Sequence, residues 1–368
     1  MSGTKKIKKI GVLTSGGDCA GLNAVIRAIV HHARLTYDWE VIGIKDGTHG
    51  LMERPINHQT LDVDDVGTNV LRMGGTFLGT INYGDPFNYP MEDGTKKDRS
   101  QEVIDGYHEL GLDAMICMGG DGSFAILQKL AAKGDMNIIA IPKTIDNDVG
   151  VTETAIGYQT AVEVATEALD RLQPTAASHH RVMILEVMGR DAGHIALSTG
   201  IAGGADVILI PEIKYNLDTI VKHIQHIRER RKRNYCLVVV AEAVKTEDGS
   251  PILRVYDDGR ARYGGIGHYL GDEIRTRTGG VDTRVTVLGH VLRGSPPTAA
   301  DRVLASAFGV HAVDMAAEGK FDRMLAWRDR DIIDVPIAEG IKSYRAVKED
   351  SIQVQTARGL GVCFGDKS

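Results

Sequence analysis

Two aspartate-rich turns carry residue types that suit the movement of a phosphoryl group. One turn spans residues 118–123 (Met-Gly-Gly-Asp-Gly-Ser), and the other spans residues 142–148 (Pro-Lys-Thr-Ile-Asp-Asn-Asp). Each follows an apolar run of the kind that forms a buried strand. Backbone N–H groups in glycine turns bind phosphate oxygens, while carboxylates hold Mg²⁺ and accept protons. Together the two turns predict phosphoryl-transfer chemistry.

A third turn, residues 15–18 (Ser-Gly-Gly-Asp), links an apolar run to an amphipathic one. Glycine there lets the backbone approach an anion, and a helix N-terminus favours negative charge. Taken alone, the motif is explained equally well by a tight turn without function. Asp121 also has two interpretations, as a ligand of Mg²⁺ between two phosphates or as a cap of the following helix. The repetition of the motif at two strand ends favours the functional interpretation.

The turn at 142–148 offers a general base. If this segment is extended, Asp146 and Asp148 lie on the same side. One carboxylate can then take a proton from a hydroxyl while the other lies near the metal, with Thr144 beside them. A cluster of turn-forming residues is the alternative explanation.

Basic residues near the ends of expected strands could bind an anionic substrate. Four arginines have such positions: Arg181, Arg190, Arg284 and Arg293. A guanidinium binds phosphate through two parallel hydrogen bonds, although any single arginine is more often a solvated surface charge. His290 precedes Arg293 by three residues and could aim at the same phosphate. Glu242 follows another apolar run and could bind a sugar hydroxyl or cap the next segment.

The elements that must position these residues alternate between short apolar runs and longer amphipathic ones. We expect strands at 7–13, 40–44, 114–118, 138–141, 181–187, 207–210, 235–240 and 283–288. We expect helices at 23–33, 124–133, 218–233 and 299–317. This alternation predicts parallel sheets covered on both faces, and the series is too long for one open sheet. The predicted fold is α/β with two doubly wound, mostly parallel-sheet domains, whose ligands bind beyond the carboxyl ends of strands.

Two segments give weaker signals. Residues 84–99 are polar and contain Pro86, Pro90 and Gly94, which predicts a long surface loop that could act as an active-site lid. The tail after Lys342 alternates weakly, ends in polar residues and gives no clear pattern.

Composition narrows the function classes. The 43% hydrophobic and 25% charged residues, with a net charge of -6, are typical of a globular protein and give no footprint for nucleic acid. The basic run 228–233 lacks interleaved aromatic residues and is interpreted as a solvated helix end. The four cysteines show no CxxC pairing, which argues against zinc and redox motifs. No apolar stretch approaches about 20 residues, and none follows the lysines of residues 1–9, so we expect a cytoplasmic protein without a membrane partner.

The motifs, in their order and spacing, resemble the phosphofructokinase family, whose members phosphorylate fructose 6-phosphate at its 1-hydroxyl. The similarity extends from about Ile10 to Ala317 and rests on the segments 14–18, 74–79, 119–123, 142–148, 186–190 and 286–294. The resemblance implies two domains with the active site in the cleft between them. Residues 1–157 with about 292–342 would hold the nucleotide and its phosphates, and residues 158–291 with the tail 343–368 would hold fructose 6-phosphate.

The resemblance also implies roles for individual residues. Asp146 is expected to be the general base. The expected catalytic residues are Asp146, Thr144, Asp148 and Arg190. Asp121 is expected to hold Mg²⁺. The donor would be held by Gly17, Asn82, Tyr83, Gly120, Asp121, Gly122 and Ser123. The sugar phosphate would be held by Thr144, Ile145, Asp146, Arg181, Met188, Gly189, Arg190, Glu242, Arg284, His290, Val291, Leu292 and Arg293. In family members the counterparts of Arg181 and Arg284 reach across a subunit interface, which implies at least a homodimer and usually a homotetramer.

Gly122 and Lys143 bear on the identity of the donor. Family members that use pyrophosphate typically place Asp where this chain has Gly122 and Lys where it has Lys143, whereas ATP users often have glycine at both. Gly122 leaves room for the α-phosphate of ATP, whereas an aspartate at that position would crowd and repel it. Lys143 could obstruct the nucleotide, but its long side chain can swing aside. The pair therefore favours ATP. Where short bacterial ATP enzymes carry Arg and Phe, this chain has Asn82, which lacks the charge, and Tyr83, which still stacks on adenine.

The resemblance therefore implies Mg²⁺-dependent transfer of the γ-phosphate of ATP to the 1-hydroxyl of fructose 6-phosphate, as in glycolysis, with pyrophosphate as the alternative donor. A non-catalytic sensor of the same fold is a rival, but it would be expected to lack the base or the metal ligand, and Asp121, Asp146 and Asp148 are all present. Diacylglycerol- and NAD-type kinases also use a Gly-Gly-Asp-Gly turn, but a set of sugar-phosphate candidates argues against them: Arg190, Glu242, His290 and Arg293.

Overall fold

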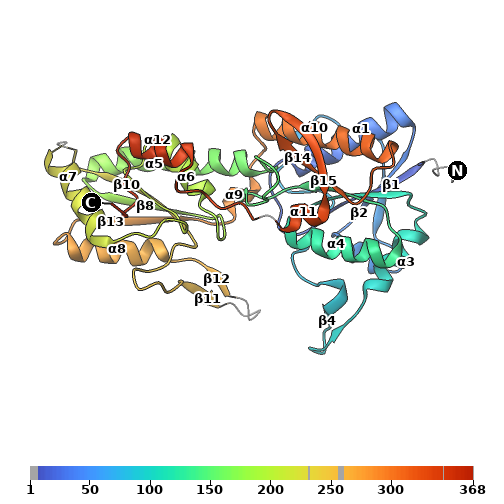
Figure 1. Cartoon of the computed structure of the whole chain (residues 1–368), viewed down its shortest axis with the longest axis horizontal. Helices are drawn as coiled ribbons and strands as arrows, with labels where there is room; N and C mark the ends of the chain where they lie inside the picture. The colour runs from blue at the N-terminus through green and yellow to red at the C-terminus, as the bar shows by residue number, and fades with distance from the viewer. Residues whose placement is uncertain (1–6, 231–232, 256–260, 343, 368) are drawn as a thin grey trace. The chain divides into compact units, whose positions relative to one another are not determined.

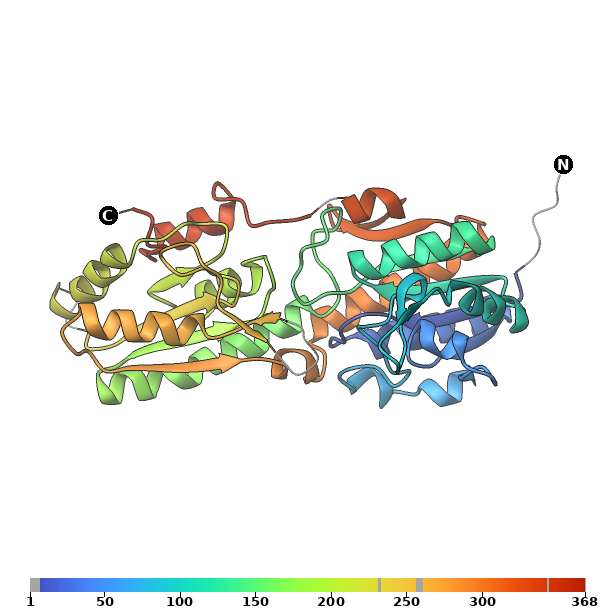
Figure 2. The same cartoon turned by 90° about the horizontal axis from the view of Figure 1, so that it is seen from below.

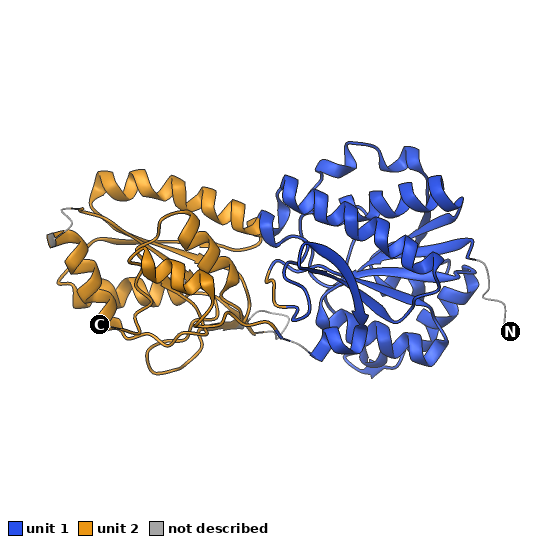
Figure 3. Ribbon diagram, turned by 45° about the horizontal axis from the view of Figure 1, so that its top comes forward, with its two compact units in different colours: residues 1–145, 149–160, 293–344 blue, residues 146–148, 161–292, 345–368 orange. Residues whose placement is uncertain are grey.

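The computed structural model describes residues 7–230, 233–255, 261–342 and 344–367. The chain forms two compact units, coloured separately in Figure 3. Unit 1 comprises residues 1–145, 149–160 and 293–344, and unit 2 comprises residues 146–148, 161–292 and 345–368. The chain therefore passes between the units several times, so that neighbouring residues of one turn belong to different units.

Unit 1 is built on a seven-stranded sheet with the order β15-β14-β7-β6-β1-β2-β3. Its strands are β1 (Lys9–Thr14), β2 (Glu40–Ile44), β3 (His58–Leu61), β6 (Ala114–Gly119), β7 (Ile138–Pro142), β14 (Arg323–Arg328) and β15 (Asp331–Pro336). The five central strands are parallel, and the edge strands β3 and β15 are antiparallel to their neighbours. The central strands β6 and β7 are buried along their whole length, as expected for a sheet with both faces covered.

Helices cover both faces of this sheet. Figure 1 shows α1 and α10 on one face and α3 and α4 on the other. The helices are α1 (Leu22–Tyr37), α2 (Thr48–Met52), α3 (Ser100–Glu109), α4 (Asp121–Gly134), α10 (Ala299–Ala317) and α11 (Ile337–Lys342), with short 3-10 turns at Val63–Val66, Val70–Arg72 and Pro86–Asn88. Close approach of α1 and α10 requires Gly309, whose added Cβ would lie 2.6 Å from the Ala28 side chain. Because α1, α3, α4 and α10 lead into the parallel strands β2, β6, β7 and β14, the C-terminal ends of these four helices lie at the amino edge of the sheet.

Unit 2 contains a four-stranded parallel sheet with the order β13-β8-β10-β9. Its strands are β8 (Val182–Val187), β9 (Val207–Leu209), β10 (Cys236–Ala241) and β13 (Thr283–Leu288), and a separate hairpin consists of β11 (Leu253–Val255) and β12 (Ala261–Tyr263). Its helices are α5 (Tyr158–His179), α6 (His194–Ala202), α7 (Leu217–Arg230), α8 (Ile266–Arg277), α9 (Val291–Gly294) and α12 (Ile352–Gly359), of which α5 and α9 begin or end in unit 1. The predicted α/β class with mostly parallel sheets is confirmed.

The tail after Lys342 returns to unit 2, as its red trace in Figure 2 shows. It forms α12 and then lies along β9, where Cys363 pairs in parallel with Val207. The Ile208 N–H donates to the Cys363 carbonyl at 3.0 Å. The tail thereby covers an otherwise unpaired sheet edge.

The segment 84–99 is more ordered than a bare loop. It contains a small hairpin of β4 (Tyr89–Pro90) and β5 (Lys96–Lys97). Tyr89 is buried, and the Arg99 guanidinium lies over its ring at 4.9 Å from the centroid. The segment is thus fixed to unit 1 at its base, while its tip is exposed.

In the part of the chain that the structure describes, no helix is long and apolar enough to span a bilayer.

Candidate active site

Three turns of unit 1 follow three neighbouring strands. β1, β6 and β7 are adjacent and parallel, so the turns 15–18, 119–123 and 143–145 begin at one edge of the sheet. Two backbone hydrogen bonds join them, from Ser15 N–H to the Met118 carbonyl and from Lys143 N–H to the Gly119 carbonyl, both at 2.9 Å. Parallel pairing therefore brings together three motifs that are far apart in the sequence.

Glycine is required in the first turn because side chains approach it closely. Gly16 has a φ of +81°, and its added Cβ would lie 3.1 Å from Ser123 Oγ. An added Cβ on Gly17 would lie 3.0 Å from Arg293 Nη1. Larger residues would close the space over this turn.

Two cations flank the first turn. Lys143 is buried, and its ammonium donates to the Gly17 carbonyl. The Arg293 guanidinium donates to the Asp18 carbonyl at 2.9 Å. Both cations therefore lie beside the backbone of this turn, where they would attract an anion. These contacts place Arg293 beside the turn 15–18 of unit 1, and its contribution to the sugar-phosphate site stays a prediction.

The start of α4 provides a carboxylate beside open space. Asp121 is exposed, and one of its oxygens accepts the Gly122 N–H at 2.7 Å. Among the described residues, nothing beyond the adjoining backbone lies within 4 Å of an added Cβ at Gly120 or Gly122. Phosphate oxygens could therefore approach the backbone N–H groups at this helix N-terminus.

These residues fit a magnesium ion that is held jointly by protein and substrate. Among the described residues, no group of three or more His, Cys, Asp and Glu side chains is arranged to hold a metal. Mg²⁺ commonly binds one or two carboxylates plus the phosphates of a substrate. Asp121, exposed and beside the open space at Gly122, matches that pattern.

The loop that carries Asn82 and Tyr83 is attached to the same turn. The Gly16 N–H donates to the Ile81 carbonyl at 3.0 Å, and Thr80 Oγ1 donates to the Gly16 carbonyl at 2.7 Å. Asn82 and Tyr83 are both exposed. Asn82 and Tyr83 therefore follow a segment that is bonded to the turn 15–18, and the base-stacking role of Tyr83 stays a prediction.

Unit 2 holds a second cluster at the carboxyl ends of β8 and β10. Glu242 follows β10, and its Oε1 accepts the N–H groups of Gly189 at 3.2 Å and Arg190 at 3.0 Å. Arg190 adopts a left-handed conformation with a φ of 49°, and its Nε lies 3.6 Å from Asp146 Oδ2. Glu242, Arg190 and Asp146 therefore form one connected group.

The Glu242 carboxyl is perturbed by its surroundings. Burial raises the pKa of Glu242 above its usual range, and the N–H donors of Arg190 and Gly189 oppose that rise. The nearby charges of Asp146 and Glu186 raise the Glu242 pKa further. A perturbed carboxyl in a polar cluster is typical of a functional site.

Glu186 is a positioning residue that the sequence analysis did not single out beyond its motif. It is fully buried at the end of β8, and its carboxylate accepts the N–H groups of Gly265 and Gly267, the latter at 2.8 Å. It thereby holds the start of α8 against the strand that carries Gly189 and Arg190. The sequence signal that could have identified Glu186 is a charged residue within an otherwise apolar strand.

The segment 144–148 differs from the extended geometry considered in the sequence analysis. It bends at Ile145 and Asp146, and Asn147 has a left-handed φ of 56°. Strand alternation therefore does not determine the sides on which Asp146 and Asp148 lie. Asp146 is nevertheless buried beside Arg190, and the Asp148 carbonyl accepts the Arg345 N–H at 2.8 Å.

The remaining candidates for substrate binding differ in their exposure to solvent. His290 and Val291 are exposed, whereas Leu292 and Ile145 are fully buried. The buried pair can contribute only backbone groups or packing. Met188 lies partly exposed at the neighbouring end of β8.

Arg181 and Arg284 do not join this cluster within the chain. Arg181 precedes β8 and Arg284 is the second residue of β13, so both lie at the amino edge of the unit 2 sheet. Both guanidinium groups bind Asp282, with Arg181 Nε 2.6 Å from Asp282 Oδ2. The hydrogen bond from Arg181 is the main cause of a lowered Asp282 pKa, and the charge of Arg284 lowers this pKa further. A six-residue strand, about 20 Å long, separates them from Arg190.

Comparisons with known proteins agree with this arrangement. A sequence model described as Phosphofructokinase matches residues 9–316. The chain is 59% identical to the ATP-dependent 6-phosphofructokinase 1 of Synechocystis sp., over 98% of this chain and 99% of that protein. The solved phosphofructokinase of Saccharomyces cerevisiae superposes with a TM-score of 0.76 at 29% identity, over 96% of this chain and 46% of that one. A pyrophosphate-dependent phosphofructokinase of Nitrosospira multiformis has a TM-score of 0.79 at 20% identity, over 96% of this chain and 91% of that one, which shows a shared fold.

The chain is thus a phosphotransferase that acts on an alcohol acceptor. It belongs to the phosphofructokinase family.

Proposed function

We propose that this protein transfers the γ-phosphate of ATP to the 1-hydroxyl of fructose 6-phosphate, giving fructose 1,6-bisphosphate and ADP, as in glycolysis. The observation that carries the proposal is the full-length 59% identity to an ATP-dependent 6-phosphofructokinase. The connected group of Asp146, Arg190 and Glu242 in unit 2, and the glycine turns of unit 1, provide the chemistry that this reaction needs.

In the proposed reaction, Asp146 accepts the proton of the 1-hydroxyl as its oxygen attacks the γ-phosphorus, and the bond from that phosphorus to the β-phosphate oxygen breaks. Arg190 lies beside the Asp146 carboxylate and is exposed enough to reach the transferred group. Glu242 accepts a sugar hydroxyl, and His290 with Arg190 binds the sugar phosphate. When Mg²⁺ is bound with the donor, Asp121 would hold it, and the ion would neutralise charge on the donor phosphates.

On the donor side, Lys143 and Arg293 balance the phosphate charge around the turn at Gly17. The space beside Gly122 is open, which supports a donor with an α-phosphate. Lys143 is turned toward the Gly17 carbonyl and lies in contact range of Gly16, at 3.4 Å from its added Cβ. The lysine is therefore directed to the first turn and does not occupy the space beside Gly122. Tyr83 is exposed, and its ring is the one proposed to stack on adenine.

The experiment that tests the donor is a coupled assay of the purified protein with fructose 6-phosphate and either ATP or pyrophosphate, each with Mg²⁺. We expect turnover with ATP and at most a trace with pyrophosphate. Turnover with pyrophosphate alone would transfer the proposal to the other donor. Tight binding of fructose 6-phosphate without turnover on either donor would support a sensor instead.

We also propose a cytoplasmic homotetramer whose sites are shared between subunits. Arg181 and Arg284 support this, because they lie at the sheet edge remote from Arg190 and could serve a neighbouring subunit's site. Size-exclusion chromatography with light scattering would distinguish a dimer from a tetramer.

A further inference from the structure

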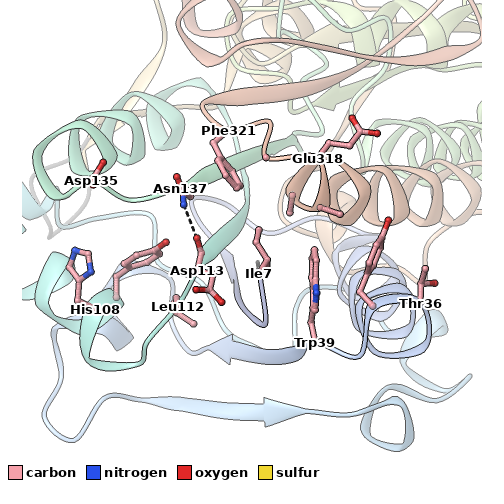
Figure 4. A pocket seen from close by; sticks show the side chains of 15 residues that line it. Ile7, Thr36, Trp39, His108, Leu112, Asp113, Asp135, Asn137, Glu318 and Phe321 are labelled. Carbon is pink, nitrogen blue, oxygen red and sulfur yellow. Dashed lines mark hydrogen bonds between the residues drawn. The ribbon is translucent and has the colours of Figure 1, made fainter. Parts of the chain in front are cut away.

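A cavity of about 870 Å³ lies at the amino edge of the unit 1 sheet. Trp39, Asp113 and Asn137 line it, and each immediately precedes a strand, β2, β6 or β7 (Figure 4). The glycine and aspartate turns follow the opposite ends of β6 and β7. The cavity therefore belongs to no part of the candidate active site.

Aromatic rings form much of its wall. Tyr37 and Trp39 stack with their ring centroids 4.7 Å apart and an interplanar angle of 25°. Tyr107 and Phe321 add two further rings, and Figure 4 shows Phe321 and Trp39 on different sides of the hollow. The Tyr37 hydroxyl donates to Asp314 at 2.8 Å, which holds the Tyr37 ring, and the Trp39 ring stacked on it, in the wall of the cavity.

The electrostatic character of the cavity is negative. Helices α1, α3, α4 and α10 all end beside it, at Tyr37, Glu109, Gly134 and Ala317. Carbonyl groups at helix C-termini carry a partial negative charge and favour cations. The lining contains the carboxylates of Asp113, Asp135 and Glu318 and includes neither lysine nor arginine among its described residues. Lys320 binds Glu318 at 2.7 Å from outside the lining and offsets one of these charges.

We propose that this cavity is a binding site for a small organic cation, an amine with an apolar body. Its ammonium group would lie among the carboxylates and helix ends, and its body would lie against the rings of Trp39 and Tyr107. Aromatic faces attract cations as well as apolar groups, so both parts of such a ligand are favoured by the same walls. Phosphates and carboxylates would be repelled, which excludes the sugar phosphates and nucleotides of the proposed reaction from this site.

The test uses two probes of similar size and opposite charge, phenethylamine and 3-phenylpropionate. The chain contains two tryptophans, Trp39 and Trp327, so the Trp327→Phe variant makes Trp39 the single fluorescent reporter. We expect a saturable change in Trp39 emission with the amine, and affinity at least about tenfold weaker for the anion. Equal response to both probes, or no response to the amine, would overturn the proposal.

A matched pair of variants tests the charge. Asp135 lies in the lining directly after α4 with a left-handed φ of 49°, a conformation that asparagine also adopts readily. Asp38 directly follows α1 with a φ of 55° and lies outside the lining. We expect Asp135→Asn to weaken amine binding by about threefold or more and Asp38→Asn to leave it unchanged. Equal effects of the two changes would mean that only the net charge of the protein is sensed, and the cavity site would be rejected. Isothermal titration calorimetry on the full chain gives the affinities, and turnover with fructose 6-phosphate confirms that each variant is folded.

Discussion

At the scale of single residues, the acceptor site depends on how Glu242 fixes the backbone of Arg190. The left-handed conformation of Arg190 costs free energy for a residue with a Cβ, and it persists because Glu242 accepts both the Gly189 and Arg190 N–H groups. The guanidinium is thereby held beside Asp146. Under the proposed roles, the base Asp146, the cation Arg190 and the carboxyl Glu242 depend on one another, so a change to any of them should lower activity.

Removal of the proposed base is the most direct test of this unit. We expect Asp146→Asn to lower kcat by about 10²- to 10⁴-fold, because the proton of the attacking hydroxyl then has no acceptor in the transition state. The KM for fructose 6-phosphate should change much less. Steady-state kinetics measures both, and an unchanged melting temperature would show that the fold is intact. Turnover near that of the unmodified protein would contradict the role of Asp146.

The raised pKa of Glu242 gives a pH dependence with a definite sign. Because burial raises its pKa, lowering the pH protonates Glu242 earlier than an ordinary glutamate, and a neutral carboxyl is a weaker acceptor for a sugar hydroxyl. The KM for fructose 6-phosphate should therefore rise as pH falls from about 8 to about 5. In Glu242→Gln we expect a KM that is high throughout and nearly flat with pH. Glu229→Gln, at an exposed position on α7, is the control that should keep the original profile.

The open space at Gly122 predicts a substitution that should abolish the use of ATP as phosphoryl donor. An aspartate there would fill space that is empty beside the α4 N-terminus and repel the α-phosphate of ATP. We expect Gly122→Asp to lower kcat/KM for ATP by about a hundredfold or more. Gly67 also has no atom within 4 Å of an added Cβ, so Gly67→Asp adds the same charge elsewhere and should leave ATP use intact. Retained ATP activity in Gly122→Asp would refute the selector argument.

At the scale of elements, sequence patterns predicted the strands and helices whose own residues carry a clear apolar run or period. The strands β2 and β13 and helix α10 have the bounds that hydrophobic runs and periodicity predict. The edge strands β3 and β15 were not predicted, because half-exposed edges carry mixed residues without a continuous apolar run. Helix α5 was also missed, and it continues through Pro174, which in a sequence signals a helix end. The described part of helix α7 ends at Arg230, and the predicted continuation to 233 passes through residues 231–232, which lie outside the described residues.

The candidate site also has features that the sequence predicts and features that it does not. Parallel pairing makes it predictable that turns after β1, β6 and β7 begin at one edge, because only strand order is needed. The bend at residues 145–146 and the left-handed Asn147 and Arg190 depend on contacts that are distant in sequence. No local pattern indicates them, since both residue types are more often found in other conformations. The cavity at the amino edge was missed for the same reason, because its lining comes from the ends of elements that are far apart in the chain.

Asp301 shows how one residue joins two long helices and allows a stability prediction. It lies on α10, is fully buried, and accepts the Gly157 N–H at 3.0 Å and the Thr160 N–H at 2.8 Å at the start of α5. In Asp301→Asn an amide N–H₂ would face one of these donors, so we expect a loss of about 2 to 3 kcal/mol in the free energy of unfolding. Val303→Ala, on the exposed side of the same helix, should change it by less than about 0.5 kcal/mol. Urea denaturation of both variants measures the difference, and equal effects would contradict the capping role.

At the scale of the whole molecule, the residues proposed for the two substrates fall in different units. Lys143 belongs to unit 1 and Asp146, three residues later, to unit 2. In the proposed reaction, donor binding and acceptor binding would therefore have separate scaffolds that are linked by a short turn. The two arginines at the far edge of the unit 2 sheet extend this division, because within one chain they have no partner in the acceptor cluster and bind Asp282.

If those arginines complete a neighbouring subunit's site, two inactive variants should restore each other. One variant carries Asp146→Asn, and the other carries Arg181→Ala with Arg284→Ala. In a mixed oligomer, a site can combine the intact Asp146 of one subunit with the intact arginines of another. For random dimers half of the molecules are hybrids with one of two sites restored, so we expect about a quarter of the unmodified activity after subunit exchange. The activity is measured after co-refolding or co-expression, with analytical ultracentrifugation to show that both variants assemble. If each active site lies within a single chain, mixing restores nothing, and the shared-site proposal fails even though each variant assembles normally.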